Sequence, residues 1–82
     1  YKIYYRLANV YNIQKQYKNA KMSAKDCLNI KRNYAPAYYE LGVSEKALGN
    51  KVAATDAFEK AKKDKNWRKS AQYELDMLNK GL

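Results

Sequence analysis

The sequence matches itself when it is shifted by 34 residues, and this internal repeat is the strongest constraint on how the chain can fold. In the first two copies the identical pairs are Tyr4/Tyr38, Tyr5/Tyr39, Leu7/Leu41, Ala20/Ala54 and Lys31/Lys65. A third copy is partly present and contains Ala71, Tyr73 and Leu75. A fixed period of this length is typical of arrays in which short helical units stack on their neighbours.

The composition favours helices over strands. The 82 residues include one Pro and three Gly, and good helix formers such as Ala, Leu, Lys and Gln are common. No stretch of useful length alternates apolar and polar residues, which argues against a half-buried strand. We therefore predict a single all-α domain over residues 1–82, with short links that make consecutive helices antiparallel. The expected helices span residues 2–14, 18–31, 36–48, 52–63 and 68–79.

Apolar side chains recur at helical spacing and predict the core. On the first helix the predicted inward residues are Tyr4, Leu7, Ala8 and Tyr11. On the later helices they include Leu41, Phe58 and Leu75. The second helix carries a small-residue face, with Ala20, Ala24 and Cys27, that lets two helices approach closely. A single cysteine excludes an internal disulfide, so Cys27 is expected to be a buried packing residue.

These two units resemble the tetratricopeptide repeat, a helix-turn-helix of about 34 residues. In the first unit the resemblance rests on Tyr4, Leu7, Ala8, Tyr11, Tyr17, Ala20 and Cys27, and in the second on Tyr38, Leu41, Gly42, Ala54, Phe58 and Ala61. It implies a right-handed α-solenoid with repeat 1 at 1–34, repeat 2 at 35–68 and a capping helix at 68–80. Departures from the family pattern are Ala24, Arg32, Glu45 and Asn66. Repeats of the Sel1 type have a longer unit and more Gly, and a plain helical bundle would not explain the fixed offset.

The residue types argue against catalysis. The chain has no His, which excludes Ser-His-Asp and Cys-His activation and His-ligated zinc. It has no Gly-rich phosphate loop, its acidic residues are scattered singly, and no Lys lies on an apolar face. We therefore expect no enzymatic activity, no cofactor and no metal, and the resemblance implies a scaffold for protein–protein interaction.

The resemblance also implies that a peptide or protein segment binds on the concave surface, which the first helix of each pair lines. The candidate peptide-binding residues are Lys2, Tyr5, Arg6, Asn9, Tyr39, Val43, Lys46 and Tyr73. The three tyrosines would form a ladder of one ring per unit, which suits recognition because Tyr gives rigid contact area. The alternative is that these rings only pack on neighbouring units. Lys2 and Arg6 lie one turn apart and suit a carboxylate, so an acidic peptide is one candidate partner. Glu40, however, stands where such a carboxylate clamp would need Asn.

The formal net charge of +9 makes nucleic acid a second class of candidate partner. Lys18, Lys21 and Lys25 form a strip on the second helix that could follow the phosphates of a nucleic acid. The strip does not continue, because Asp56 and Glu59 occupy the equivalent side of the fourth helix. Nucleic acid is therefore the less favoured partner. The sequence leaves two roles for the strip, which are binding of a partner and solvation of the helix. A third interpretation is a structural or oligomerisation spacer.

The N-terminal end of the array is not capped by polar residues. Tyr1, Ile3 and Val10 lie on a face that a preceding unit would normally cover, so we expect a fragment of a longer chain and self-association through this face. No apolar run is long enough to cross a membrane, so membrane insertion is not expected. The compartment stays open, with the cytoplasm as the default and the cell envelope as the alternative.

Overall fold

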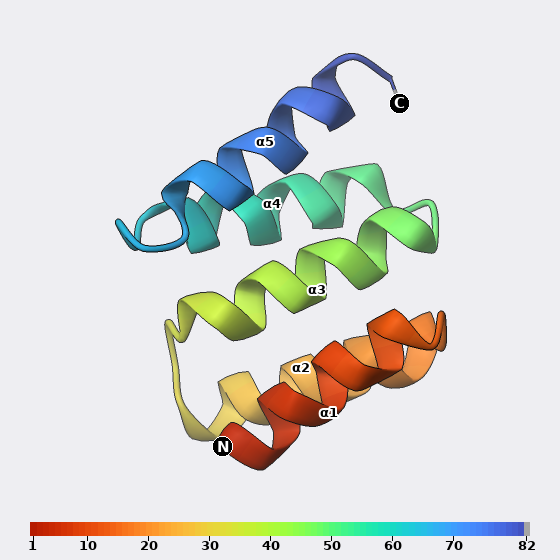
Figure 1. The fold of residues 1–82 in the computed structure, drawn as a ribbon, viewed down its shortest axis with the longest axis vertical. Helices are drawn as coiled ribbons and strands as arrows, with labels where there is room; N and C mark the ends of the chain where they lie inside the picture. Colours follow the sequence, from red (N-terminus) through yellow and green to blue (C-terminus); the bar gives the residue numbers. More distant parts are fainter. Residues whose placement is uncertain (82) are drawn as a thin grey trace.

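The computed structural model describes residues 1–81, and all the regular structure in these residues is helical. The helices are α1 (Lys2–Ile13), α2 (Tyr17–Ile30), α3 (Ala35–Ala47), α4 (Lys51–Lys62) and α5 (Arg68–Asn79). Their bounds lie within one residue of the predicted spans at each end. The prediction of five helices without strands is therefore confirmed for the described part of the chain (Figure 1).

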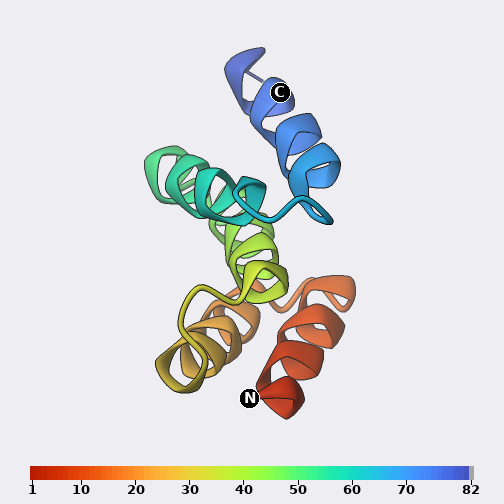
Figure 2. The ribbon, with the colours of Figure 1, turned by 90° about the vertical axis from the view of Figure 1, so that its left-hand side faces the viewer.

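Consecutive helices run antiparallel and stack in two columns. Figure 1 shows the α1–α2 pair at one end, the α3–α4 pair in the middle and α5 at the other end. In Figure 2, α1, α3 and α5 lie on one side of the molecule, and α2 and α4 lie on the other. Helix α3 contacts both α1 and α2, and α5 packs against α4. Each unit therefore rests on the one before it, as a stacked repeat requires. The right-handed sense of the superhelix stays a prediction.

The turn between the two helices of a unit is the same in both units, although only one of them contains glycine. The N–H of Gln16 donates to the carbonyl oxygen of Tyr11 at 2.8 Å, and the equivalent bond of the second unit has the same length. Gly49 adopts φ +84° in its turn, and Lys15 adopts φ +63° at the equivalent place. A left-handed lysine costs about 1–2 kcal/mol, so the packing of the helix pair overrides the local preference.

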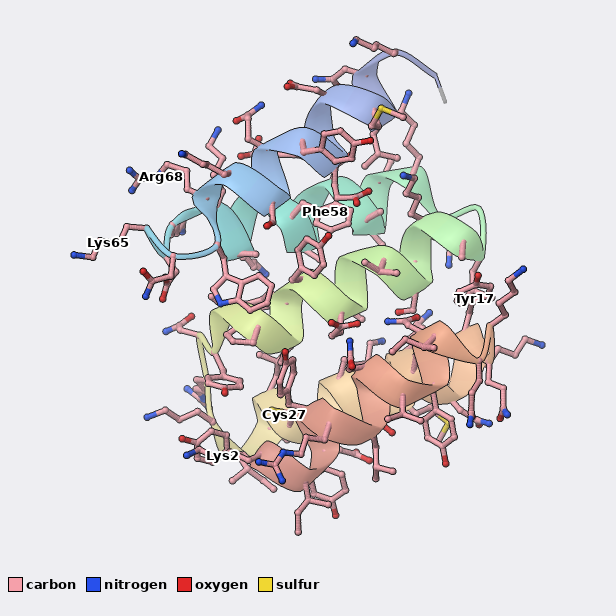
Figure 3. The ribbon with its side chains drawn as sticks, viewed as in Figure 1. Lys2, Tyr17, Cys27, Phe58, Lys65 and Arg68 are labelled. Atoms are coloured by element: carbon pink, nitrogen blue, oxygen red, sulfur yellow. The ribbon has the colours of Figure 1, made fainter. Side chains whose placement is uncertain are left out.

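Small side chains dominate the core. In the first unit, Ala8, Ala20, Ala24 and Cys27 are fully buried, which confirms the packing role predicted for Cys27. In the second unit Phe58 is fully buried, and Figure 3 shows it between the central and upper helices. Around this ring the buried cluster consists of Ala54, Ala61, Ala71, Leu75 and Leu78. The apolar contact between α4 and α5 is therefore the part of the core with the largest side chains.

Two residues of α1 that were predicted to be buried are exposed. Leu7 is 38% exposed and Tyr4 is 37% exposed, so the prediction was wrong for both. Leu7 corresponds to Leu75, which is buried in the cluster between α4 and α5, whereas α1 is the first helix of residues 1–81 and has no preceding helix there on which Leu7 could pack. Leu41, one unit after Leu7, is partly buried. Phe58 and Leu75 are buried as predicted.

The first prediction concerns Gly42, where α3 and α4 approach closely. A Cβ atom on Gly42 would lie 2.6 Å from Cε1 of Phe58. We expect Gly42→Ala to lower the free energy of unfolding by about 1–3 kcal/mol because the ring has no room to move. This loss should outweigh the helix propensity of alanine, which is better than that of glycine by about 1 kcal/mol. Urea unfolding followed by circular dichroism measures the change.

The matched control combines Gly42→Ala with Phe58→Ala. The pair then copies the first unit, where the equivalent residues Ala8 and Ala24 are both fully buried. In this background Gly42→Ala should not destabilise the fold, because the ring that its Cβ would meet is gone. A single Gly42→Ala variant with a higher urea midpoint than the wild type would contradict the close packing of α3 on α4.

Candidate peptide-binding face

The first helix of each unit contributes to one continuous side of the molecule, which Figure 2 shows as the column of α1, α3 and α5. We call this side the α1–α3–α5 face, and it carries the predicted peptide-binding residues. Polar contacts cross it from α1 to α3 and from α3 to α5. These contacts determine which of the candidate side chains are free to meet a ligand.

The contact from α1 to α3 centres on Glu40, whose side chain is buried although it carries a carboxylate. The Nδ2 group of Asn9 donates to Oε2 of Glu40 at 3.1 Å. The Nδ2 group of Asn12 donates to Oε1 of Glu40 at 2.9 Å and to its main-chain oxygen at 3.0 Å. Within residues 1–81 no Lys or Arg forms an ion pair with this carboxylate. Because a buried charge without donors is costly, Asn9 and Asn12 are structural partners of Glu40.

The contact from α3 to α5 has the same layout. The Nζ group of Lys46 donates to Oε1 of Glu74 at 2.9 Å, and the hydroxyl of Tyr39 donates to Oε2 of Glu74 at 3.3 Å. Counted within the 34-residue units, Glu40 and Glu74 are both sixth residues. Each receives a donor from the twelfth residue of the preceding unit, which is Asn12 or Lys46. The two contacts are therefore one interaction repeated at the period of the chain.

Glu74 was not among the predicted site residues, although the sequence holds a signal for a shared role of Glu40 and Glu74. They are identical at the 34-residue offset that relates the second and third copies. A charged residue that recurs at the same place in two stacked units indicates a contact between the units. The sequence does not show, however, that the donor would come from the first helix of the preceding unit.

The ring of Tyr39 is held in place by packing and by a carboxylate. Its centroid lies 5.6 Å from that of Phe58 and 5.2 Å from that of Trp67. Aromatic pairs at such distances stabilise a fold beyond the area that they bury. Burial, together with the nearby carboxylate of Glu74, raises the pKa of Tyr39 from 10.0 to about 12. The packing interpretation of the tyrosine ladder therefore accounts for the position of this ring.

The other two rings of the predicted ladder differ from each other. Tyr5 meets Tyr34 edge-on at a centroid distance of 5.8 Å, and burial raises the pKa of its hydroxyl. Tyr73 is 61% exposed on α5. The structure therefore places Tyr5 in a packing contact between the ends of repeat 1, and it leaves Tyr73 open to solvent.

The remaining candidates also divide into side chains that pack in the fold and side chains that are exposed to solvent. Val43 is partly buried and packs against the core cluster around Phe58. Lys2 and Arg6 are exposed on α1, and neither forms an ion pair within the described residues. Among the predicted peptide-binding residues, Lys2, Arg6 and Tyr73 are thus the side chains with neither a packing role nor a polar partner in this part of the chain.

The predicted lysine strip on α2 is interrupted by an ion pair. The Nζ group of Lys21 lies 3.2 Å from Oε1 of Glu45, which is buried on α3. The same oxygen accepts a hydrogen bond from Nδ2 of Asn50 at 2.8 Å. Lys18 and Lys25 are exposed. Lys21 therefore joins the first unit to the second, and two lysines of the strip remain free.

The described residues show no arrangement for metal or thiol chemistry. Within residues 1–81 no three His, Cys, Asp or Glu side chains come together in a group that could hold a metal ion. Burial raises the pKa of the Cys27 thiol, which favours the inert thiol over the reactive thiolate. None of the five helices is long and apolar enough to cross a membrane.

The stacked helix pairs and the 34-residue repeat of this sequence are features of a known protein family. The family model for the tetratricopeptide repeat matches residues 1–34 and 35–63. The chain belongs to the tetratricopeptide repeat family. Searches against curated proteins and against solved structures gave no significant match. Tetratricopeptide repeats generally mediate protein–protein interactions and are typically non-catalytic scaffolds.

The second prediction follows from the raised pKa of Tyr39. In the unfolded chain Tyr39 loses its proton near pH 10, and in the folded chain it keeps the proton until the pH reaches about 12. Its contribution to stability is therefore complete below about pH 10 and is lost as the pH rises through about 12. We expect the urea midpoint to fall less between about pH 8 and about pH 11 in Tyr39→Phe than in the wild type.

Tyr73→Phe is the matched control, because Tyr73 is an exposed tyrosine on the same face. The urea midpoint of Tyr73→Phe should fall between about pH 8 and about pH 11 by as much as that of the wild type. Equal losses for the wild type and for both variants would show that the Tyr39 hydroxyl is not held in the buried contact with Glu74.

Proposed function

We propose that this tetratricopeptide repeat chain is a non-catalytic scaffold that binds a peptide or protein segment on its concave side, the α1–α3–α5 face. The observation that carries the proposal is the arrangement of free side chains. Lys2 and Arg6 on α1 and Tyr73 on α5 are exposed at the two ends of this face, whereas Glu40 and Glu74 tie its middle together. A segment that crosses the face from α1 to α5 would contact both groups.

The free side chains favour an acidic ligand. Lys2 and Arg6 lie one helical turn apart, and the ion pairs of the described residues involve neither of them. An Arg guanidinium can bond a carboxylate in bidentate fashion. Tyr73 adds an exposed ring with an apolar body and a polar tip. The ligand that fits best is an acidic segment that also carries an apolar or aromatic side chain toward α5.

The other candidates shape the face and support the ligand indirectly. Asn9 and Lys46 hold the carboxylates of Glu40 and Glu74, and Tyr39 is packed against the core. Substitution of these residues would disturb the stacking of the units before it disturbed a ligand. A test of binding must therefore use the exposed residues.

Nucleic acid remains the alternative ligand. Lys18 and Lys25 are the free cations of the strip on α2, because Lys21 is paired with Glu45. Two free cations on one helix make a short track for phosphates, and nucleic-acid binders usually combine such a track with stacking rings. Self-association through the exposed side of α1, with a spacer role for the chain, also stays a prediction.

The third prediction separates the two surfaces. A peptide is selected on the wild-type chain from a displayed random library, and a mixed-sequence single-stranded RNA is the second probe. We expect Arg6→Ala/Tyr73→Ala to weaken peptide binding about tenfold or more, as the loss of two anchor residues does in other interfaces. Lys18→Glu/Lys25→Glu is the matched control on the opposite side, and it should leave the peptide affinity nearly unchanged.

The salt dependence of binding distinguishes the outcomes further. Affinity for RNA falls steeply with salt because counterions are released, whereas a peptide held by desolvated anchors is less sensitive. All four substituted side chains are exposed, so circular dichroism should show intact helices in both variants. If RNA binds more tightly than the selected peptide, and Lys18→Glu/Lys25→Glu alone abolishes it, the strip on α2 is the functional surface.

A further inference from the structure

The positive charge of this chain is most concentrated at one edge of the stack. Residues 31–35 and 60–69 hold eight of the 17 Lys and Arg residues but one of the eight acidic residues, so their net charge is +7. These two segments contain the links from α2 to α3 and from α4 to α5, and Figure 1 shows both links on the same side of the molecule. We call residues 31–35 and 60–69 the link edge.

A hollow at the link edge joins its two segments. It has a volume of about 290 Å³, and its walls come from α3, α4 and both links. The Nζ group of Lys60 lies 5.5 Å from the centroid of the Tyr38 ring, which holds this amine at the hollow. The lining residues are Asn33, Ala35, Tyr38, Lys60, Lys63 and Asp64.

Most cations around the hollow are available for a ligand. Lys63, Lys65 and Arg68 are exposed, and none of them forms an ion pair within residues 1–81. Figure 3 shows the side chains of Lys65 and Arg68 pointing away from the body of the molecule. The carboxylate of Asp64 is engaged in its own turn, where Oδ1 accepts from the main-chain N–H of Asn66 at 2.8 Å.

The repeat itself does not require this cluster of cations. In the first unit the segment that corresponds to residues 60–69 is residues 26–35. It holds two cations and one carboxylate, whereas residues 60–69 hold six cations and one carboxylate. Both segments serve the same link between units, so the additional charge of the second segment has a different purpose.

The fold gains little from these charges. Lys60 lies 3.1 Å from Asp56, but both side chains are exposed, and such pairs contribute little to stability. Arg68 and Lys69 begin α5, whose first turn has no acidic residue. Cations at the N-terminus of a helix oppose its dipole, and the crowded cations repel one another. A charge cluster that works against the fold indicates an anionic ligand.

Among anionic ligands, the backbone of a duplex nucleic acid fits the link edge best. Its regularly spaced phosphates can neutralise several cations at once, and the counterions that they release drive binding. Binders of single strands stack bases on aromatic rings. Here Tyr38 lies under Lys60, and Trp67 packs on Tyr39 at a centroid distance of 5.2 Å. Because both rings are already engaged, the link edge offers contacts to phosphates and not to bases.

We propose that the link edge binds the phosphate backbone of a duplex nucleic acid, independently of its sequence. One phosphate lies at the hollow, where the amines of Lys60 and Lys63 neutralise it. Lys65 and Arg68 contact the neighbouring phosphates. This site shares no residue with the proposed peptide-binding face or with the lysine strip on α2, so it gives the chain a second binding surface.

The experiment measures binding of the full chain to a mixed-sequence DNA duplex two helical turns long, about 20 base pairs, across a salt series. Lys65→Gln/Arg68→Gln removes two exposed charges from the link edge. Lys18→Gln/Lys25→Gln removes the same charge from α2 and is the matched control. We expect the first variant to bind about tenfold more weakly or worse, with a slope of log affinity against log salt that is smaller by about two. The control should lose less than about threefold, because its charges are distant and screened.

Thermal unfolding of the same variant without DNA separates a binding role from a structural one. Lys65→Gln/Arg68→Gln should unfold no lower than the wild type, because it relieves repulsion between cations and the opposition to the dipole of α5. A lower midpoint together with unchanged duplex affinity would show that these cations serve the fold, and it would overturn the proposal.

Three further measurements identify other outcomes. The peptide selected on the α1–α3–α5 face should bind Lys65→Gln/Arg68→Gln as it binds the wild type, so that this inference and the proposed function fail independently. Equal weakening of duplex binding by both double variants would overturn the inference, because net charge alone would then explain it. Tighter binding of one strand of the same DNA, or binding of the wild type to phosphatidylserine vesicles without binding to the duplex, would also overturn it and identify the other ligand.

Discussion

One polar contact recurs between successive units, in which the twelfth residue of a unit donates to the glutamate at the sixth place of the next. Asn12 makes this contact with Glu40 and Lys46 makes it with Glu74, each at 2.9 Å. The core of the first unit is built largely from alanine, and such a surface does little to fix how far one helix slides along another. Asn12 and Glu40 are buried, whereas Lys46 and Glu74 are partly buried, and a polar pair that is shielded from water is satisfied in few arrangements. We interpret the contact as the device that fixes the register of α1, α3 and α5.

This register determines which side chains are left for a partner. Asn9 and Lys46 are engaged with the glutamates, whereas Lys2 and Arg6 of α1 form no ion pair within residues 1–81. Arg6 is one of these, and it occupies the sixth position, where the later units carry glutamate. It belongs to the face on which we propose that a ligand binds. The excess of positive charge in the first unit supports our proposal of an acidic ligand there.

The helices and their order could be predicted because the repeat and the helical spacing are local features of the sequence. The left-handed turn at Lys15 could not be predicted, since only the packing of the helix pair enforces it. The burial of Leu7 was predicted wrongly because an apolar pattern does not reveal whether another helix covers it. The roles of Tyr39 and Lys46 depend on Glu74, which lies 35 and 28 residues further along the chain. Such contacts follow from the tertiary structure and not from the spacing of one helix.

The most direct test of the register is a double-mutant cycle on Lys46 and Glu74. Lys46→Glu and Glu74→Lys each replace an ion pair of 2.9 Å by two like charges, and each should lower the free energy of unfolding by about 1–2 kcal/mol. The double variant exchanges the two charges, so the account predicts a coupling energy of about 1 kcal/mol that recovers part of this loss. The cycle also cancels the separate loss of the hydrogen bond from Tyr39. If the two losses simply add, the side chains do not interact in solution and the contact does not fix the register.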